Sequence, residues 1–156
     1  MAKSNKTFSF DDLNEELKNL NPMGSVMEMS DFSEITEYID TGNYHLNACI
    51  SGSLFKGWPN NRAVSVAGPS GTGKTFLMLN SVREAIDMGY SVIYYDSEAA
   101  IDKDLMKKFG IDISKVNYQP VNTVQEFRTS VTTITKKMQE AKRNGAELPK
   151  VMILLD

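Results

Sequence analysis

Apolar and polar positions alternate along most of this chain in blocks of strand length and helix length. Runs typical of buried strands predict strands over residues 63–67, 91–95 and 151–155, with a shorter strand over 116–120. Amphipathic stretches between these runs predict helices over residues 74–88, 103–109 and 124–143. Strands that alternate with helices are typical of an α/β fold with a largely parallel sheet.

The N-terminal part of the chain has a different pattern. One helical stripe stands out, with apolar residues at three- and four-residue spacing: Phe10, Leu13, Leu17 and Leu20. Ser9 and Asp12 are spaced as a capping box, and the helix is expected to end near Asn21 and Pro22. The turn formers and methionines that follow indicate a linker. We therefore predict a helical arm and linker over residues 1–35, and a second domain over residues 36–156.

Composition limits the classes of protein that fit. The 156 residues are 41% hydrophobic and 24% charged, which is typical of a soluble globular protein. The net charge of -3 gives no overall electrostatic footprint of a nucleic-acid binder. A single cysteine, Cys49, excludes an intramolecular disulfide, and no apolar run approaches the roughly 20 residues that span a bilayer. No signal peptide is visible, so we expect a reducing, cytoplasmic compartment and no membrane partner.

One motif carries specific chemistry. Residues 68–75 match the Walker A pattern G-x-x-x-x-G-K-[ST], between a predicted strand and a predicted helix. We expect the whole loop to bind the phosphates of ATP: Gly68, Pro69, Ser70, Gly71, Thr72, Gly73, Lys74 and Thr75. Lys74 is expected to neutralise the β- and γ-phosphate oxygens, and the Thr75 hydroxyl to coordinate Mg²⁺. The alternative is a glycine-rich turn that caps a helix and leaves Lys74 solvated.

Acidic residues follow directly on the predicted strand 91–95. Ligands of open α/β sheets bind beyond the carboxyl ends of the strands, so Asp96, Glu98 and Asp102 are expected to face the same crevice as the Walker A loop. Glu98 is our candidate to polarise the attacking water. The alternative is that these acids only cap the helix that begins near Asp102.

A third acidic position closes the last apolar run. Asp156 follows residues 151–155 as a Walker B aspartate follows its buried strand, which predicts that Asp156 helps to hold Mg²⁺. The alternative is an incidental acid after a core strand.

The order and spacing of these motifs over residues 38–156 resemble the RecA family. The wording "AGPS", "YYDSE" and "QPVNTVQEF" is similar to phage-encoded recombinases of the UvsX type. The resemblance implies a RecA-like P-loop NTPase core with a largely parallel, incomplete sheet, preceded by a helical arm that links protomers. It also implies that Glu98 activates the water and that Asp102 faces the adenine amino group. Leu105 stands where the bacterial family usually has a stacking tyrosine.

The function that the resemblance implies is a DNA-dependent ATPase, using ATP and Mg²⁺, that forms filaments on single-stranded DNA for recombination and repair. A phage-encoded protein of this kind would act in the host cytoplasm. The family's DNA-binding loops follow the Walker B strand, so we expect a truncated chain without DNA-stimulated ATPase activity. The resemblance also implies that the strand between residues 63–67 and 151–155 comes after Asp156. We therefore expect unpaired strand edges that make the chain aggregate when it is alone. The alternatives are a RecA-like motor such as a replicative helicase, and a nucleotide-binding module without turnover.

Overall fold

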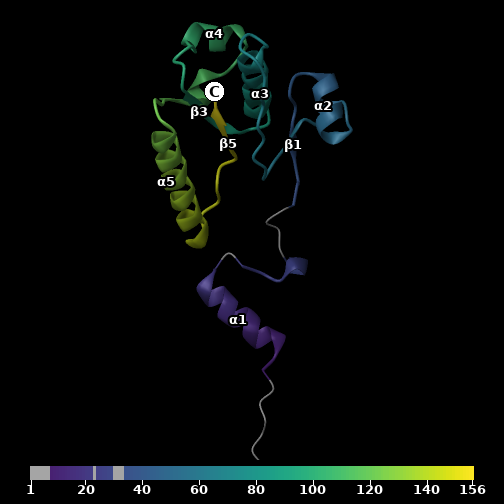
Figure 1. Ribbon diagram of the computed structural model, residues 1–156, viewed down its shortest axis with the longest axis vertical. Coiled ribbons are helices and arrows are strands. Elements are labelled where there is room, and N and C mark those ends of the chain that lie inside the picture. Colours follow the sequence, from purple (N-terminus) through teal and green to yellow (C-terminus); the bar gives the residue numbers. More distant parts are fainter. Residues whose placement is uncertain (1–7, 23, 30–33) are drawn as a thin grey trace, which may run out of the picture. The chain divides into compact units, whose positions relative to one another are not determined.

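The computed structural model of the protein describes residues 8–22, 24–29 and 34–156. Contacts within the chain divide it into two compact units, Met1–Ile35 and Thr36–Asp156. Figure 1 labels helices α1 to α5 and strands β1, β3 and β5.

The first unit contains helix α1 (Phe10–Leu20) and a short 3-10 helix, η1 (Met27–Met29). The predicted capping box at the start of α1 is confirmed. The Ser9 hydroxyl accepts a hydrogen bond from the Asp12 backbone N–H, and the Asp12 carboxylate accepts one from the Ser9 backbone N–H. No residue of α1 is buried, so its apolar stripe is exposed on this unit.

The second unit begins with a small antiparallel sheet. Strand β1 (Tyr38–Ile39) pairs with β2 (Trp58–Pro59), and helix α2 (Tyr44–Ser51) lies between them in the chain. The Trp58 indole N–H donates to the Ser81 hydroxyl at 2.8 Å, which fastens this sheet to helix α3 (Lys74–Asp87).

The main sheet has three parallel strands in the order β4-β3-β5. Strand β3 (Ser91–Asp96) is central, between β4 (Val116–Pro120) and β5 (Val151–Leu155). Three of the four predicted strands are thereby confirmed, as is the α/β class with a parallel sheet.

The prediction of a strand over residues 63–67 is wrong. These residues have no strand pairing and are mostly exposed, with Val64 at 51%. An apolar run becomes a strand only when its backbone groups bond to a neighbouring strand. Both edges of β3 are already paired, and the second edge of β5 has no partner among the described residues.

Helices cover both faces of the sheet, and the predicted helices are confirmed as α3 (Lys74–Asp87), α4 (Lys103–Lys108) and α5 (Val124–Arg143). A short 3-10 helix, η2 (Ile113–Lys115), precedes β4. The buried core joins α3, α4 and one face of β3. The Tyr95 ring, on the opposite face of β3, contacts the Phe127 ring of α5 at a centroid distance of 4.9 Å. In Figure 1, α3 and α5 accordingly flank β3 and β5.

Candidate functional site

The predicted Walker A loop leads from an exposed segment into the first turn of α3. Two of its glycines adopt positive φ, at 76° for Gly71 and 88° for Gly73. A side chain at either position would be strained because L residues rarely adopt this conformation. The glycines of the motif thus match the backbone that the loop takes.

The N-terminus of α3 lacks a side-chain cap. Its N-cap residue is Gly73, which offers no side-chain hydrogen bond. The other four α-helices of the described residues each have a capping side chain: Ser9, Asn43, Asp102 and Thr123. The first N–H groups of a helix have no partner within the helix, so an uncapped N-terminus leaves these donors open to an anion.

Lys74 lies over the loop that precedes it. Its ammonium donates to the Gly68 carbonyl at 3.0 Å and to the Pro69 carbonyl at 2.9 Å. The Thr72 hydroxyl also donates to the Pro69 carbonyl, at 2.8 Å. An ammonium has three donors, so one remains for a phosphate oxygen. These contacts hold the Lys74 ammonium near the N-terminus of α3.

Chain geometry brings the Walker A loop to the carboxyl end of the sheet. The 14 residues of α3 span roughly 21 Å, and the 6 residues of β3 roughly 20 Å. Residues 88–90 connect the end of α3 to the start of β3, and the two elements pack together in the core. The chain therefore reverses direction, and the start of α3 lies at the level of the end of β3.

Asp96 is the buried acid at that end of β3, with 2% of its surface exposed. Its carboxylate accepts from the Glu98 N–H at 2.9 Å, the Ile101 N–H at 3.1 Å and the Tyr118 hydroxyl at 3.0 Å. Burial alone would raise the pKa of Asp96, but these hydrogen bonds outweigh it and lower the pKa below its ordinary 3.8. Asp96 thus stays ionised and holds the loop over residues 97–101.

Glu98 lies in this loop and is exposed. Its backbone is held by Asp96, and the next residue, Ala99, has a positive φ of 52°. A non-glycine residue in that region is strained, and such strain tends to occur at functional sites. The Glu98 carboxylate is therefore presented on a constrained loop at the carboxyl end of the sheet, where it can reach water.

Asp156 follows β5 and is fastened to β3. Its N–H donates to the Tyr95 carbonyl at 2.9 Å, and its carbonyl accepts from the Ser97 N–H at 2.9 Å. The Tyr94 hydroxyl donates to the Asp156 Oδ2 at 2.8 Å. Burial, followed by this bond, raises the pKa of Tyr94. Sequence reasoning missed the contact between Tyr94 and Asp156, because a tyrosine within an apolar run is indistinguishable from a core residue.

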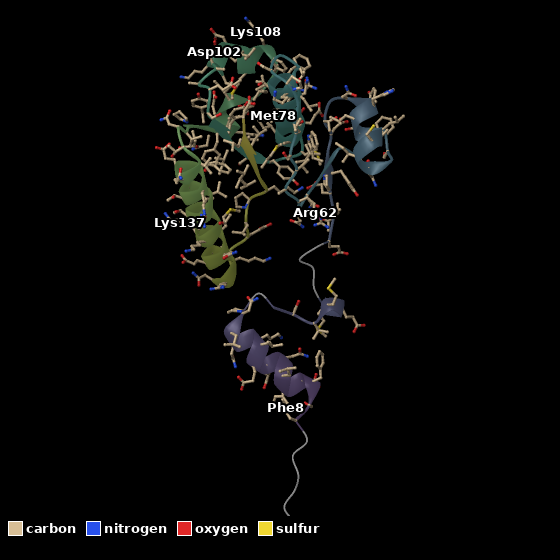
Figure 2. The ribbon with its side chains drawn as sticks, viewed as in Figure 1. Phe8, Arg62, Met78, Asp102, Lys108 and Lys137 are labelled. Carbon is tan, nitrogen blue, oxygen red and sulfur yellow. The ribbon has the colours of Figure 1, made fainter. Side chains whose placement is uncertain are left out.

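Asp102 is the N-cap of α4, and its Oδ1 accepts from the Leu105 N–H at 2.7 Å. Of the two interpretations made from sequence, the capping role is the one with a visible contact. Figure 2 labels Asp102 and Lys108, which mark the two ends of α4.

The structure brings Asp96, Asp156, Tyr94 and Tyr118 into direct contact as two tyrosine–aspartate pairs. Among the described residues, no hydrogen bond or ion pair joins the loop over 68–75 to Glu98 or Asp156. The described part of the chain also contains no group of three or more acidic, histidine or cysteine side chains that can hold a metal. A few oxygen ligands still fit Mg²⁺, because this ion keeps several waters and binds substrate phosphates.

Comparison with known proteins gives a family. The sequence profile of the RecA N-terminal domain matches residues 11–136. Protein RecA of Bacteroides thetaiotaomicron is 32% identical over 117 residues, which is 74% of this chain and 34% of the relative. Protein RecA of Streptomyces coelicolor is 38% identical over 104 residues, which is 65% of this chain and 27% of the relative. Protein RecA of Lactobacillus acidophilus is 30% identical over 127 residues, which is 81% of this chain and 34% of the relative.

A mixed α/β fold with a parallel sheet is thus the class that the elements define. The chain belongs to the RecA family. It spans about a third or less of the length of the curated relatives cited above. None of the described helices combines the length and apolar character needed to cross a membrane.

Proposed function

We propose that the chain is the ATP-binding part of a RecA-type recombinase, a DNA-dependent ATPase that forms filaments on single-stranded DNA for recombination and repair. The observation that carries this proposal is the position of the Walker A sequence, which lies at the one α-helix N-terminus of the described residues that has no side-chain cap. Glu98 and Asp156 lie at the carboxyl end of the parallel sheet, where ligands of α/β folds bind. Family membership supports the rest.

In this proposal the loop over residues 68–75 binds the phosphates through its backbone N–H groups and Lys74. The Thr75 hydroxyl and the Asp156 carboxylate hold Mg²⁺, which neutralises charge on the phosphates when bound. Asp102 contacts the adenine through the carboxylate oxygen that does not cap α4. Each of these roles follows from the family resemblance together with the position of the residue.

Hydrolysis needs a water in line with the γ-phosphate. We assign Glu98 to orient this water and accept its proton as the water oxygen bonds to the γ-phosphorus. The bond from that phosphorus to the bridging oxygen then breaks, and ADP and phosphate are the products. Glu98 suits this role because its carboxylate is exposed while its backbone is fixed by Asp96.

The partners are single-stranded DNA and further copies of the chain. The exposed apolar stripe of α1 supports the proposal that residues 1–35 link protomers in a filament, with residues 36–156 as the ATPase core. The wording of the Walker A and Glu98 segments favours the phage UvsX type, which acts in the host cytoplasm.

Titration with a fluorescent ATP analogue in the presence of Mg²⁺ tests the binding site. Lys74→Ala should remove most of the binding, because the cation that faces the phosphates is lost. Lys137→Ala is the matched control, an exposed lysine on α5 that Figure 2 labels. Equal affinity in the wild-type protein and Lys74→Ala would refute the assignment. DNA-stimulated phosphate release by the full-length protein would then separate a recombinase from a module without turnover.

A further inference from the structure

The two tyrosine–aspartate pairs repeat one geometry across the sheet. Tyr118 on β4 lies opposite Tyr94 on β3, and its hydroxyl donates to Asp96, two residues further along β3. Tyr94 in turn lies opposite Leu154 on β5, and its hydroxyl donates to Asp156, two residues beyond Leu154. Each tyrosine therefore leans along the strand direction and donates to an acid at the carboxyl end of the next strand, which is the last residue of β3 for Asp96 and the residue after β5 for Asp156.

We propose that Tyr94 is a positioning residue for the metal site, which fixes the Asp156 carboxylate so that Oδ1 is directed to the metal and its waters. This inference rests on the proposed function and deepens it. The Tyr94 hydroxyl donates to Oδ2 at 2.8 Å, so one carboxylate oxygen is already committed to a protein donor. A hydrogen bond to an ionised acceptor is stronger than a neutral one, and it removes rotational freedom from the carboxylate.

Burial makes Tyr94 a rigid support. Its ring has 0% of its surface exposed and packs in the core with Leu79 and Val82 of α3. A ring held in this way cannot follow a moving carboxylate, so the hydroxyl defines where Oδ2 lies. Asp156 itself is only partly buried and follows the last residue of β5, where the side chain would otherwise rotate.

Tyr95, the next residue on β3, offers a control that distinguishes the positioning role of Tyr94 from a role in core packing alone. Tyr95 is equally buried, at 0% exposure, but it faces the other side of the sheet. Its hydroxyl lies 2.7 Å from the Ser130 hydroxyl of α5, and its ring contacts Phe127. Tyr94→Phe and Tyr95→Phe each remove one buried hydroxyl from adjacent positions of one strand, and only the first removes a contact to Asp156.

The test measures binding of Mn²⁺ to the ADP complex of the full-length protein by electron paramagnetic resonance. Loss of the partner that orients a metal-binding group typically costs 10- to 100-fold in metal affinity, so we expect Tyr94→Phe to weaken Mn²⁺ binding roughly tenfold. Tyr95→Phe should match the wild-type protein. In an Asp156→Asn background, Tyr94→Phe should have no further effect. Equal Mn²⁺ affinity in Tyr94→Phe and the wild-type protein would overturn the inference.

A second measurement needs no substitution at Tyr94. In wild-type protein labelled with ¹³C at the tyrosine ring carbon that bears the hydroxyl, adding Mg²⁺ to the ADP complex should shift the Tyr94 signal, because the metal draws charge from Asp156. The Tyr95 signal, identified with Tyr95→Phe, should not move. A spectrum in which no buried tyrosine responds to Mg²⁺ would refute the positioning role. Loss of ADP binding is a separate result, which would count against the proposed function instead.

Discussion

Tyr118 shows how a single hydroxyl can support the loop that presents Glu98. It donates to Asp96, whose carboxylate also binds the backbone of that loop. We predict that Tyr118→Phe lowers the free energy of unfolding by about 1 kcal/mol, the usual net value of one hydrogen bond. Tyr118 is 38% exposed, so water replaces part of the lost contact. Chemical denaturation compares this variant with Tyr44→Phe, an exposed tyrosine on α2.

The pH dependence of the same variant gives a second check. The folded-state pKa of Asp96 lies below 3.8, so the stability that its ionised form contributes is present above that pH and is lost as the pH falls through the folded pKa. The difference between the wild-type protein and Tyr118→Phe should therefore shrink in acid. A difference that stays constant from neutral pH to below 3.8 would show that the Asp96 contact is not its source.

At the scale of elements, Glu37 ties together three segments that are distant in sequence. Its carboxylate accepts from Lys150, which precedes β5, at 2.7 and 3.0 Å. It also accepts from the Tyr90 hydroxyl, before β3, at 2.6 Å. The bond to Lys150, followed by that to Tyr90, lowers the pKa of Glu37. Burial, followed by the bond to Glu37, raises the pKa of Tyr90 to about 12, so the hydroxyl remains a donor.

We predict that Glu37→Gln destabilises the second unit by about 1 kcal/mol or less, because Lys150 is half exposed and the pair is screened by solvent. The pKa of Glu37 is lowered from 4.5, so its contribution is present at neutral pH and is lost in acid as the pH falls through the folded pKa. Thermal unfolding at neutral and acid pH measures this. Glu84→Gln is the control, since the ion pair of Glu84 is with its sequence neighbour Arg83. An equal loss of thermal stability in Glu37→Gln and Glu84→Gln at neutral pH would show that the contacts of Glu37 with Lys150 and Tyr90 do not stabilise the second unit.

Elements whose signals are local could be predicted from the sequence. Helix α5 begins at a capping box formed by Thr123 and Glu126, and both ends of its predicted range are correct. Strand β5 also has its predicted bounds. The strand predicted over residues 63–67 did not form, although this run is also mostly apolar, because a strand depends on a partner that the pattern does not specify. The tyrosine–aspartate pairs depend on strand order and register, which local patterns do not contain.

At the scale of the whole molecule, the chain consists of two compact units with different composition. The first presents an amphipathic helix with no buried residue, and the second has the sheet and the candidate nucleotide site. An amphipathic helix gains most of its stability from packing of its apolar face. We therefore propose that the apolar face of α1 in the first unit packs on another copy of the chain, and that the second unit carries out catalysis.

The central proposal is that Glu98 activates the water that attacks ATP bound at the Walker A loop. The hydrolysis rate of Glu98→Gln in the full-length protein tests it most directly. Single-turnover phosphate release and ATP affinity should be measured together, with Glu140→Gln on the exposed face of α5 as control. We predict that Glu98→Gln retains ATP affinity while its hydrolysis rate falls by roughly 10²- to 10⁴-fold, the range typical of a general base. Hydrolysis at the wild-type rate would contradict the account.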